Sequence, residues 1–178
     1  MSMQIQKPMN YLNFIVICLI LRLRDVIYPP KYVLNDVEIT PGDTVLDFGC
    51  GPVNYTIPVA EKLDDDGKII AIDYNPDALK KVEKKAKKNE ITNIKTINSD
   101  CETGLPSNSV DVILLYYVFN DLENPDKVLH ELYRVLKTQG ILSLSEYNIR
   151  KISPKLEKKA FFEIQKKNEL THTFVKIF

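Results

Sequence analysis

The sequence contains few cysteines and no excess of charge of either sign. Its three cysteines, Cys18, Cys50 and Cys101, are too few and too scattered for a disulfide framework or a zinc site. We therefore expect no metal and a cytoplasmic location. The 24 basic residues balance 24 acidic ones, and only four of the basic residues are arginines. Domains that bind nucleic acid carry a basic excess and favour arginine for phosphate contacts, so nucleic acid is not an expected partner.

Long hydrophobic runs are also absent. The densest run, from Phe14 to Leu21, falls well short of the ~20 residues that cross a bilayer, so no transmembrane segment is expected. The sequence predicts instead a buried helix over residues 10–28, packed on the domain. A lid over a ligand cavity and a membrane-surface helix are the alternatives. We divide the chain into an N-terminal helical segment or lid (1–36) and one main domain (37–178).

Short apolar strands alternate with helical segments from residue 44 onward. We expect strands at 44–48, 68–73, 94–100, 110–118 and 140–147, followed by a closing hairpin of 161–168 and 171–178. Helices are expected at 54–63, from 76 onward, at 125–137 and near 153–160, with Asn75 and Pro76 opening the second. This alternation predicts an α/β fold in which helices cover both faces of a parallel sheet, with an antiparallel edge.

Several polar residues have plain structural interpretations. The lysines from Lys80 to Lys88 fit the solvated outer face of a helix, and a specific anionic partner is the alternative. His130 and His172 fit surface or packing positions. None of them points by itself to a reaction.

The stretch "VLDFGCGPVNYT", residues 45–56, predicts a ligand-binding loop at the end of the first strand. Gly49 permits a tight turn, and Gly51 lets the backbone approach a ligand closely. N–H groups of the following helix would favour a carboxylate or a phosphate. The thiol of Cys50 is expected to face the core.

Three acidic residues fall at the ends of the first three strands, where parallel sheets bind ligands. Asp47 would repel a pyrophosphate and attract a cation. Asp73 follows Gly51 by 22 residues, where a carboxylate can accept hydrogen bonds from ribose hydroxyls. Asp100 could accept a hydrogen bond from an adenine amino group. Each acid alone fits a cap or turn equally well, but together they predict a ligand site.

Five stretches in this order resemble the successive motifs of the class I S-adenosylmethionine-dependent methyltransferases, within the quinone-biosynthesis-like group. They are "VLDFGCGPVNYT", "AIDYNPDAL", "NSDCETGLP", "VDVILLYYVFNDLENP" and "RVLKTQGILSLSE". The resemblance implies a Rossmann-like, doubly wound sheet of seven strands in the order 3-2-1-4-5-7-6, one of them antiparallel. It also implies S-adenosyl-L-methionine as cofactor.

The resemblance further implies roles for individual residues. Gly49 and Gly51 would lie beside the methionine part of the cofactor, with Asp47 near its amino group. Asp73 would bind the ribose, and Asp100 with Cys101 would contact the adenine. The complete cofactor-binding set comprises Asp47, Gly49, Cys50, Gly51, Asp73, Tyr74, Asp100, Cys101 and Tyr116.

Val53 departs from the family pattern, which often has a third glycine there. A valine that points into the interface between sheet and helix would cost little. A valine that points at the ligand would weaken binding roughly 5- to 150-fold.

The segment after the fourth strand holds the candidates for catalysis, Tyr116, Asn120 and Asp121. It lacks the Pro-Pro-Tyr or Pro-Pro-Phe motif of enzymes that methylate nucleic-acid amino groups. Asparagine cannot act as a base, so proton removal falls to Asp121 or to the acidity of the acceptor itself. Asp121 fits a helix cap equally well. Tyr116 and Tyr117 could form a substrate wall or fill the core.

These observations predict a cytoplasmic methyltransferase that uses S-adenosylmethionine and acts on a small molecule. A homodimer is a possible oligomeric state. The first alternative is a protein that binds the cofactor without turnover, or a partner subunit. The second is an NAD-binding oxidoreductase, against which stand Asp47 and the lack of room for a substrate domain in 178 residues.

Overall fold

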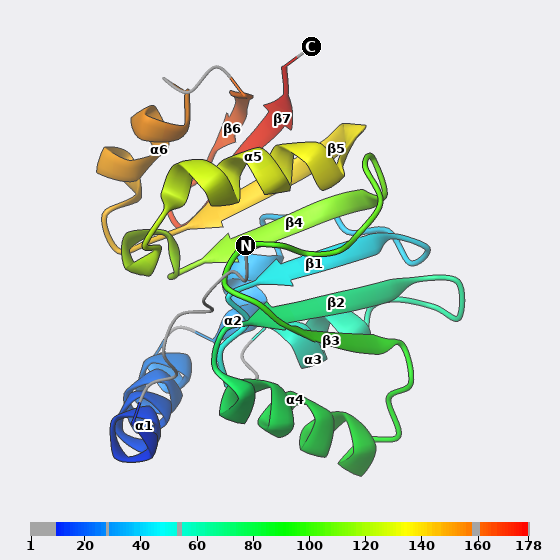
Figure 1. The fold of residues 1–178 in the computed structure, drawn as a ribbon, viewed down its shortest axis with the longest axis vertical. Coiled ribbons are helices and arrows are strands. Elements are labelled where there is room, and N and C mark those ends of the chain that lie inside the picture. The colour runs from blue at the N-terminus through cyan, green and yellow to red at the C-terminus, as the bar shows by residue number, and fades with distance from the viewer. Residues whose placement is uncertain (1–9, 28, 53–54, 158–160, 178) are drawn as a thin grey trace, which may run out of the picture.

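A seven-stranded sheet forms the centre of the protein (Figure 1), in a computed structural model that describes residues 10–27, 29–52, 55–157 and 161–177. The strand order is β3-β2-β1-β4-β5-β7-β6. The strands are β1 (Thr44–Phe48), β2 (Lys68–Asp73), β3 (Ile94–Asn98), β4 (Val110–Tyr116), β5 (Leu136–Ser145), β6 (Phe162–Lys167) and β7 (His172–Lys176). The first five pair in parallel, and β7 runs antiparallel to both β5 and β6. The predicted fold class and strand order are confirmed.

Helices cover both faces of the sheet (Figure 1). Helices α5 (Pro125–Val135) and α6 (Ile149–Glu157) pack on one face, over apolar residues of β1, β2, β4 and β5. Helices α2 (Pro30–Leu34), α3 (Thr56–Ala60) and α4 (Pro76–Lys88) pack on the other. Strands β1 and β4 lie between the two layers, so their unbroken apolar runs are buried on both faces.

Two helices begin where an asparagine precedes a proline. The side chain of Asn75 accepts a hydrogen bond from the N–H of Asp77 at 3.0 Å, and Pro76 starts α4. Asn124 accepts from the N–H of Lys127 at 3.1 Å and caps α5 in the same way. Both caps satisfy N–H groups that a helix leaves unpaired, so these starting points follow from local sequence.

Other boundaries differ from the prediction. The helix expected at 54–63 is confined to Thr56–Ala60, and the one expected near 153–160 is α6, which begins earlier at Ile149. The short helix α2 was not predicted. Helix α5 ends at Val135 because Leu136 is already extended, with ψ 133°. The strand expected to begin at Gly140 begins earlier, at Leu136, so Gly140 lies within β5, where a Cβ atom would stand 2.8 Å from the carbonyl oxygen of Asp111.

Helix α1 (Tyr11–Ile27) lies at the lower left of Figure 1, beside α4. Phe14 and Cys18 are buried against Ala78 of α4, whereas seven large apolar side chains of α1 are exposed. The prediction of a buried helix is therefore wrong, because only one side of α1 packs on the domain. Among the described residues, no helix is long and apolar enough to cross a membrane.

Candidate functional site

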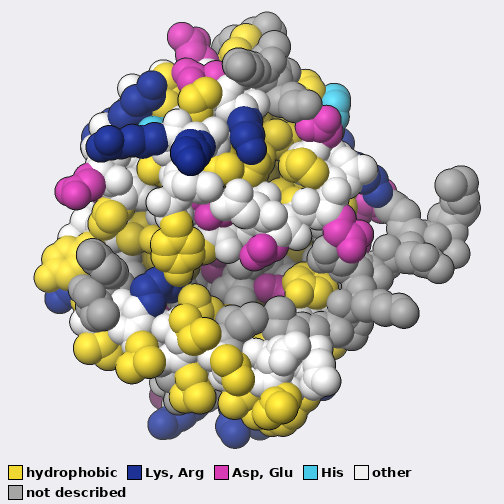
Figure 2. All heavy atoms as spheres, turned by 90° about the vertical axis from the view of Figure 1, so that its left-hand side faces the viewer, with side chains coloured by type: hydrophobic (Ala, Val, Ile, Leu, Met, Phe, Trp, Pro, Cys, Tyr) yellow, Lys and Arg dark blue, Asp and Glu magenta, His cyan; other side chains and the backbone are white. Residues whose placement is uncertain are grey.

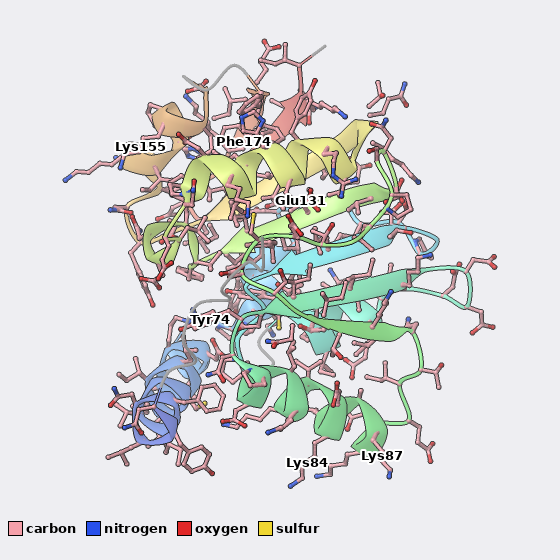
Figure 3. The ribbon with its side chains drawn as sticks, viewed as in Figure 1. Tyr74, Lys84, Lys87, Glu131, Lys155 and Phe174 are labelled. Atoms are coloured by element: carbon pink, nitrogen blue, oxygen red, sulfur yellow. The ribbon has the colours of Figure 1, made fainter. Side chains whose placement is uncertain are left out.

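Two neighbouring cavities open at the carboxyl edge of the sheet, by the glycine loop. The smaller has a volume of about 180 Å³ and the larger about 540 Å³. Both are lined by Gly49, Asp73, Tyr74, Val118 and Asp121. Figure 3 places Tyr74 just beyond β2, between the sheet and α1. Because five residues are shared, the two cavities form one extended site that lies across the ends of β1, β2 and β4, where the strand order reverses.

The glycine loop is held against β2 by its own backbone. The N–H groups of Gly49 and Cys50 both donate to the carbonyl oxygen of Ile72, at 2.8 and 2.9 Å. Gly49 and Gly51 have positive φ angles of 73° and 55°, which glycine adopts without steric cost. A Cβ on Gly49 would lie 2.4 Å from Val118, whereas a Cβ on Gly51 would meet no described atom within 4 Å. Gly49 thus permits close packing, and Gly51 leaves open space beside the larger cavity.

Replacing Gly49 with alanine is expected to lower the free energy of unfolding by about 2–4 kcal/mol. The substitution combines an unfavourable positive φ with a clash against Val118. Gly51→Ala is the matched control, because it meets the same φ penalty without the clash and should cost only about 1–2 kcal/mol. Urea unfolding of the three proteins measures the difference. Equal losses for the two variants would contradict the packing role of Gly49.

Asp73 stands between the two cavities and organises the turn after β2. One carboxylate oxygen accepts the N–H of Gly51 and the other that of Asn75, both at 2.8 Å. Asn98 donates to the carbonyl oxygens of Asp73 and Tyr74, which fixes the same turn. Burial raises the pKa of Asp73 although both N–H donors act to lower it. Each carboxylate oxygen can still accept a further hydrogen bond, so the group can receive two hydroxyls of a ligand.

Asp47 lies outside both cavities, and its predicted place near the amino group of the cofactor stays a prediction. Its carboxylate is buried and accepts the hydroxyl of Thr56 at 2.6 Å, and it lines neither cavity. Its pKa is raised to about 7, chiefly by burial and also by the charge of Asp73, while the hydrogen bond from Thr56 acts to lower it. The structure therefore puts Asp47 beneath the glycine loop and not on the cavity wall.

The remaining predicted cofactor residues divide between core and cavity. Asp100 and Cys101 line the smaller cavity beside Ser99, and Tyr74 lines both. Cys50 packs in a core cluster with Ala71, Leu79 and Val82, as expected, while also bordering the larger cavity. Burial raises the pKa of both thiols. These cysteines therefore supply contact surface and not a thiolate.

The three catalytic candidates do not converge. Asp121 lines both cavities, and it is not the cap of α5, which is Asn124. Tyr116 borders the larger cavity, but its buried hydroxyl shares a hydrogen bond of 2.8 Å with Ser143. Asn120 lines neither cavity and donates to the carboxylate of Glu146 at 3.0 Å. Asp121 is therefore the one candidate of the three that lines both cavities and carries a group able to accept a proton.

Arg24, Tyr55 and Tyr147 of the larger cavity were missed from the sequence, and they surround Tyr117. The guanidinium carbon of Arg24, from α1, lies 4.6 Å from the ring centre of Tyr117 and 6.0 Å from that of Tyr55. The rings of Tyr117 and Tyr147 are in contact at a tilt of 50°, with their centres 4.8 Å apart. Arg24 also pairs with Asp25 at 2.7 Å. The available signal for Arg24 was its place among the charged residues that end the apolar run of α1, and nothing local marked the tyrosines as its partners.

Tyr117 adopts a left-handed backbone conformation with φ 54°. Its N–H donates to the carbonyl oxygen of Ser145 at 2.8 Å, which continues the pairing of β4 with β5. A bulky residue in this conformation costs of order 1–3 kcal/mol and is typically found at functional sites. The strained turn places Tyr117 in the wall of the larger cavity, where its ring also packs against the edge of a core cluster.

Val53 lies outside the described residues. His130 packs edge-on against Phe161 with ring centres 4.3 Å apart, and His172 is buried in β7, so both are packing residues. Among the described residues, no group of three His, Cys, Asp or Glu side chains could hold a metal ion.

The chain matches the family model described as "Methyltransferase domain" over residues 39–176. It is 29% identical over 114 residues to demethylmenaquinone methyltransferase of Listeria welshimeri, a match that covers 64% of this chain and 48% of the relative. The chain thus spans about half the length of the curated relatives it matches.

Solved structures share the fold. A SAM-dependent methyltransferase from Aquifex aeolicus superposes with a TM-score of 0.77 at 24% identity, covering 84% of this chain and 90% of that one. The cyclase SpnF superposes with a TM-score of 0.68 at 20% identity, covering 77% and 57%. The fold is therefore shared by proteins named for different reactions.

Proposed function

Because the chain belongs to the methyltransferase-domain family, we propose that it transfers a methyl group from S-adenosylmethionine to a small-molecule acceptor. The observation that carries this proposal is the extended site in which the glycine loop and Asp73 separate two joined cavities. One cavity suits the cofactor's nucleoside and the other its methionine part and the acceptor. The same site was predicted from the order of five sequence motifs.

The described residues fit the cofactor. Asp73 retains acceptor capacity for two ribose hydroxyls, and Asp100 with Cys101 would border the adenine in the smaller cavity. Gly51 and Cys50 would face the methionine part, with Tyr74 between the two ends. Asp47, whose pKa is about 7, would favour the cationic cofactor through the charge that it carries above that pH. The bound cofactor supplies an activated methyl group on a positive sulfur, so the protein must mainly align the acceptor.

The walls of the larger cavity support an aromatic acceptor. Tyr55, Tyr117 and Tyr147 offer ring faces and edges, and Arg24 lies against two of these rings. A flat apolar molecule would stack there, and a hydroxyl or carboxylate on it could approach the guanidinium. Demethylmenaquinone, which names the substrate of the curated relatives, belongs to this chemical class.

Asp121 is the proposed group for proton removal, where the acceptor must lose a proton. Asn120 and Tyr116 would act as positioning residues. Asn120 and the N–H of Phe119 both donate to Glu146, at 3.0 and 2.8 Å, which anchors the loop that carries Asp121. The hydrogen bond between Tyr116 and Ser143 holds the floor of the cavity.

Calorimetric titration with S-adenosylmethionine, S-adenosylhomocysteine and NAD tests the cofactor. We expect micromolar binding of the first two and none of NAD. Binding of NAD alone, or of none of the three, would overturn the proposal. Release of S-adenosylhomocysteine with aromatic acceptors then separates a transferase from a protein that only binds the cofactor. The comparisons give no support to the oxidoreductase or binding-only alternatives, and a cytoplasmic location and a homodimer remain predictions.

A further inference from the structure

The outer side of α1 is an apolar surface without a role in the domain. Of the nine large apolar side chains that are exposed in the described part of the chain, seven belong to α1. They are Tyr11, Leu12, Val16, Leu19, Ile20, Leu23 and Val26. From Leu12 to Val26 the spacings place them along one side of the helix, which we call the outer stripe. Folded proteins rarely expose such a continuous apolar surface without a partner.

The opposite side of α1 already has its contacts. Phe14 and Cys18 are buried against Ala78 of α4, and Leu21 with Arg24 lines the larger cavity. The helix therefore has two different apolar sides, one that holds it on the domain and one that faces away. Figure 2 shows apolar side chains gathered across the lower part of the face on which α1 lies, with basic side chains at the lower edge.

A row of lysines lies on α4, the helix beside α1. Helix α4 lies directly beside α1, since the Nζ atom of Lys81 is 2.9 Å from the sulfur of Cys18 and 4.4 Å from the ring centre of Phe14. Helix α4 contains six lysines and two acidic residues. Lys80, Lys84, Lys87 and Lys88 are exposed on its side away from the sheet, and Figure 3 shows Lys84 and Lys87 pointing out on the lower side of the molecule.

We propose that the outer stripe of α1 and the lysine row of α4 dock the protein on the surface of an anionic lipid bilayer. The stripe would enter the boundary between headgroups and acyl chains, and the lysines would face the lipid phosphates. Each lysine near an anionic surface strengthens binding roughly fivefold. A second copy of the chain is the poorer occupant, because pairing two outer stripes would bring two lysine-rich helices toward each other. This proposal does not depend on the cofactor or on methyl transfer.

Cosedimentation with lipid vesicles tests the docking surface. The full chain is mixed with vesicles of phosphatidylcholine alone or with 30% phosphatidylserine, at low and at 0.5 M salt. We expect binding to the anionic vesicles, weakened at least tenfold by high salt or by the neutral lipid. The double variant Leu19→Glu/Leu23→Glu should lose binding, and Lys84→Gln/Lys87→Gln should weaken it roughly tenfold or more. Lys62→Gln/Lys68→Gln, which removes two exposed lysines that belong to neither α1 nor α4, is the matched control and should bind like the wild type.

Circular dichroism and thermal unfolding first establish that each variant is folded, which is expected because all the substituted side chains are exposed. Three outcomes would overturn the proposal. The wild type could remain in the supernatant with anionic vesicles. The Leu19→Glu/Leu23→Glu variant could bind as well as the wild type. Finally, ultracentrifugation could show a dimer that this variant abolishes while no vesicle binding occurs, which would make a second copy the occupant.

Discussion

Replacing Asp73 with alanine is expected to weaken binding of S-adenosylmethionine by about 2–3 kcal/mol, or roughly 30- to 150-fold. The carboxylate lies at the junction of the two cavities and is largely buried. At a largely buried position, water cannot fully replace the charged acceptor that a ligand hydroxyl loses when the carboxylate is removed. The variant also removes the acceptor for the N–H groups of Gly51 and Asn75, so the turn loses its tie to the glycine loop.

Calorimetry on folded protein measures this loss. Asp77→Ala is the matched control, because Asp77 lies four residues further along, at the start of α4, where it pairs with Lys80 and lines neither cavity. The control should bind the cofactor within about twofold of the wild type. A loss under twofold for Asp73→Ala itself would contradict its role in binding the ribose.

Replacing Asp47 with asparagine is expected to stabilise the protein at alkaline pH. The pKa of Asp47 is about 7 in the fold, against 3.8 for the ordinary carboxyl group. Between these values the folded state holds a proton that the unfolded state has released, so stability falls as the pH rises through this window. The difference corresponds to a destabilisation on the order of 4 kcal/mol above pH 7. Asparagine carries no charge and keeps an oxygen that can accept the hydroxyl of Thr56.

Urea unfolding of both proteins at pH 4.5 and pH 8 measures this effect. The difference in free energy of unfolding, variant minus wild type, should increase by several kcal/mol from the lower to the higher pH. Asp73 and Glu146, whose pKa values burial also raises, titrate in both proteins and largely cancel in the comparison. A difference that is independent of pH would mean that Asp47 is ionised in the folded state at both pH values.

The sheet could be predicted from the sequence because its signals are local. The stretches "TVLDF" and "KIIAID" are bounded by turn residues, and they match β1 and β2 to the residue. The Asn-Pro pairs at 75–76 and 124–125 define helix starts through one cap and one restricted φ angle. Helix ends were harder to predict. At Leu136 the chain changes from helix to strand without a glycine or a turn, because pairing with β4 determines the boundary.

The sequence by itself determined the fold, the glycine loop and the position of Asp73. The ends of parallel strands meet at one edge of a sheet, so the spacing of 22 residues between Gly51 and Asp73 brings the first two strand ends together there. Only the tertiary structure decided which side chains face the ligand space. It turned Asp47 toward Thr56 and Asn120 toward Glu146, and it brought Arg24 against Tyr55 and Tyr117. It also left the outer side of α1 exposed. These placements depend on packing between segments that are distant in the chain, which no local pattern of residues encodes.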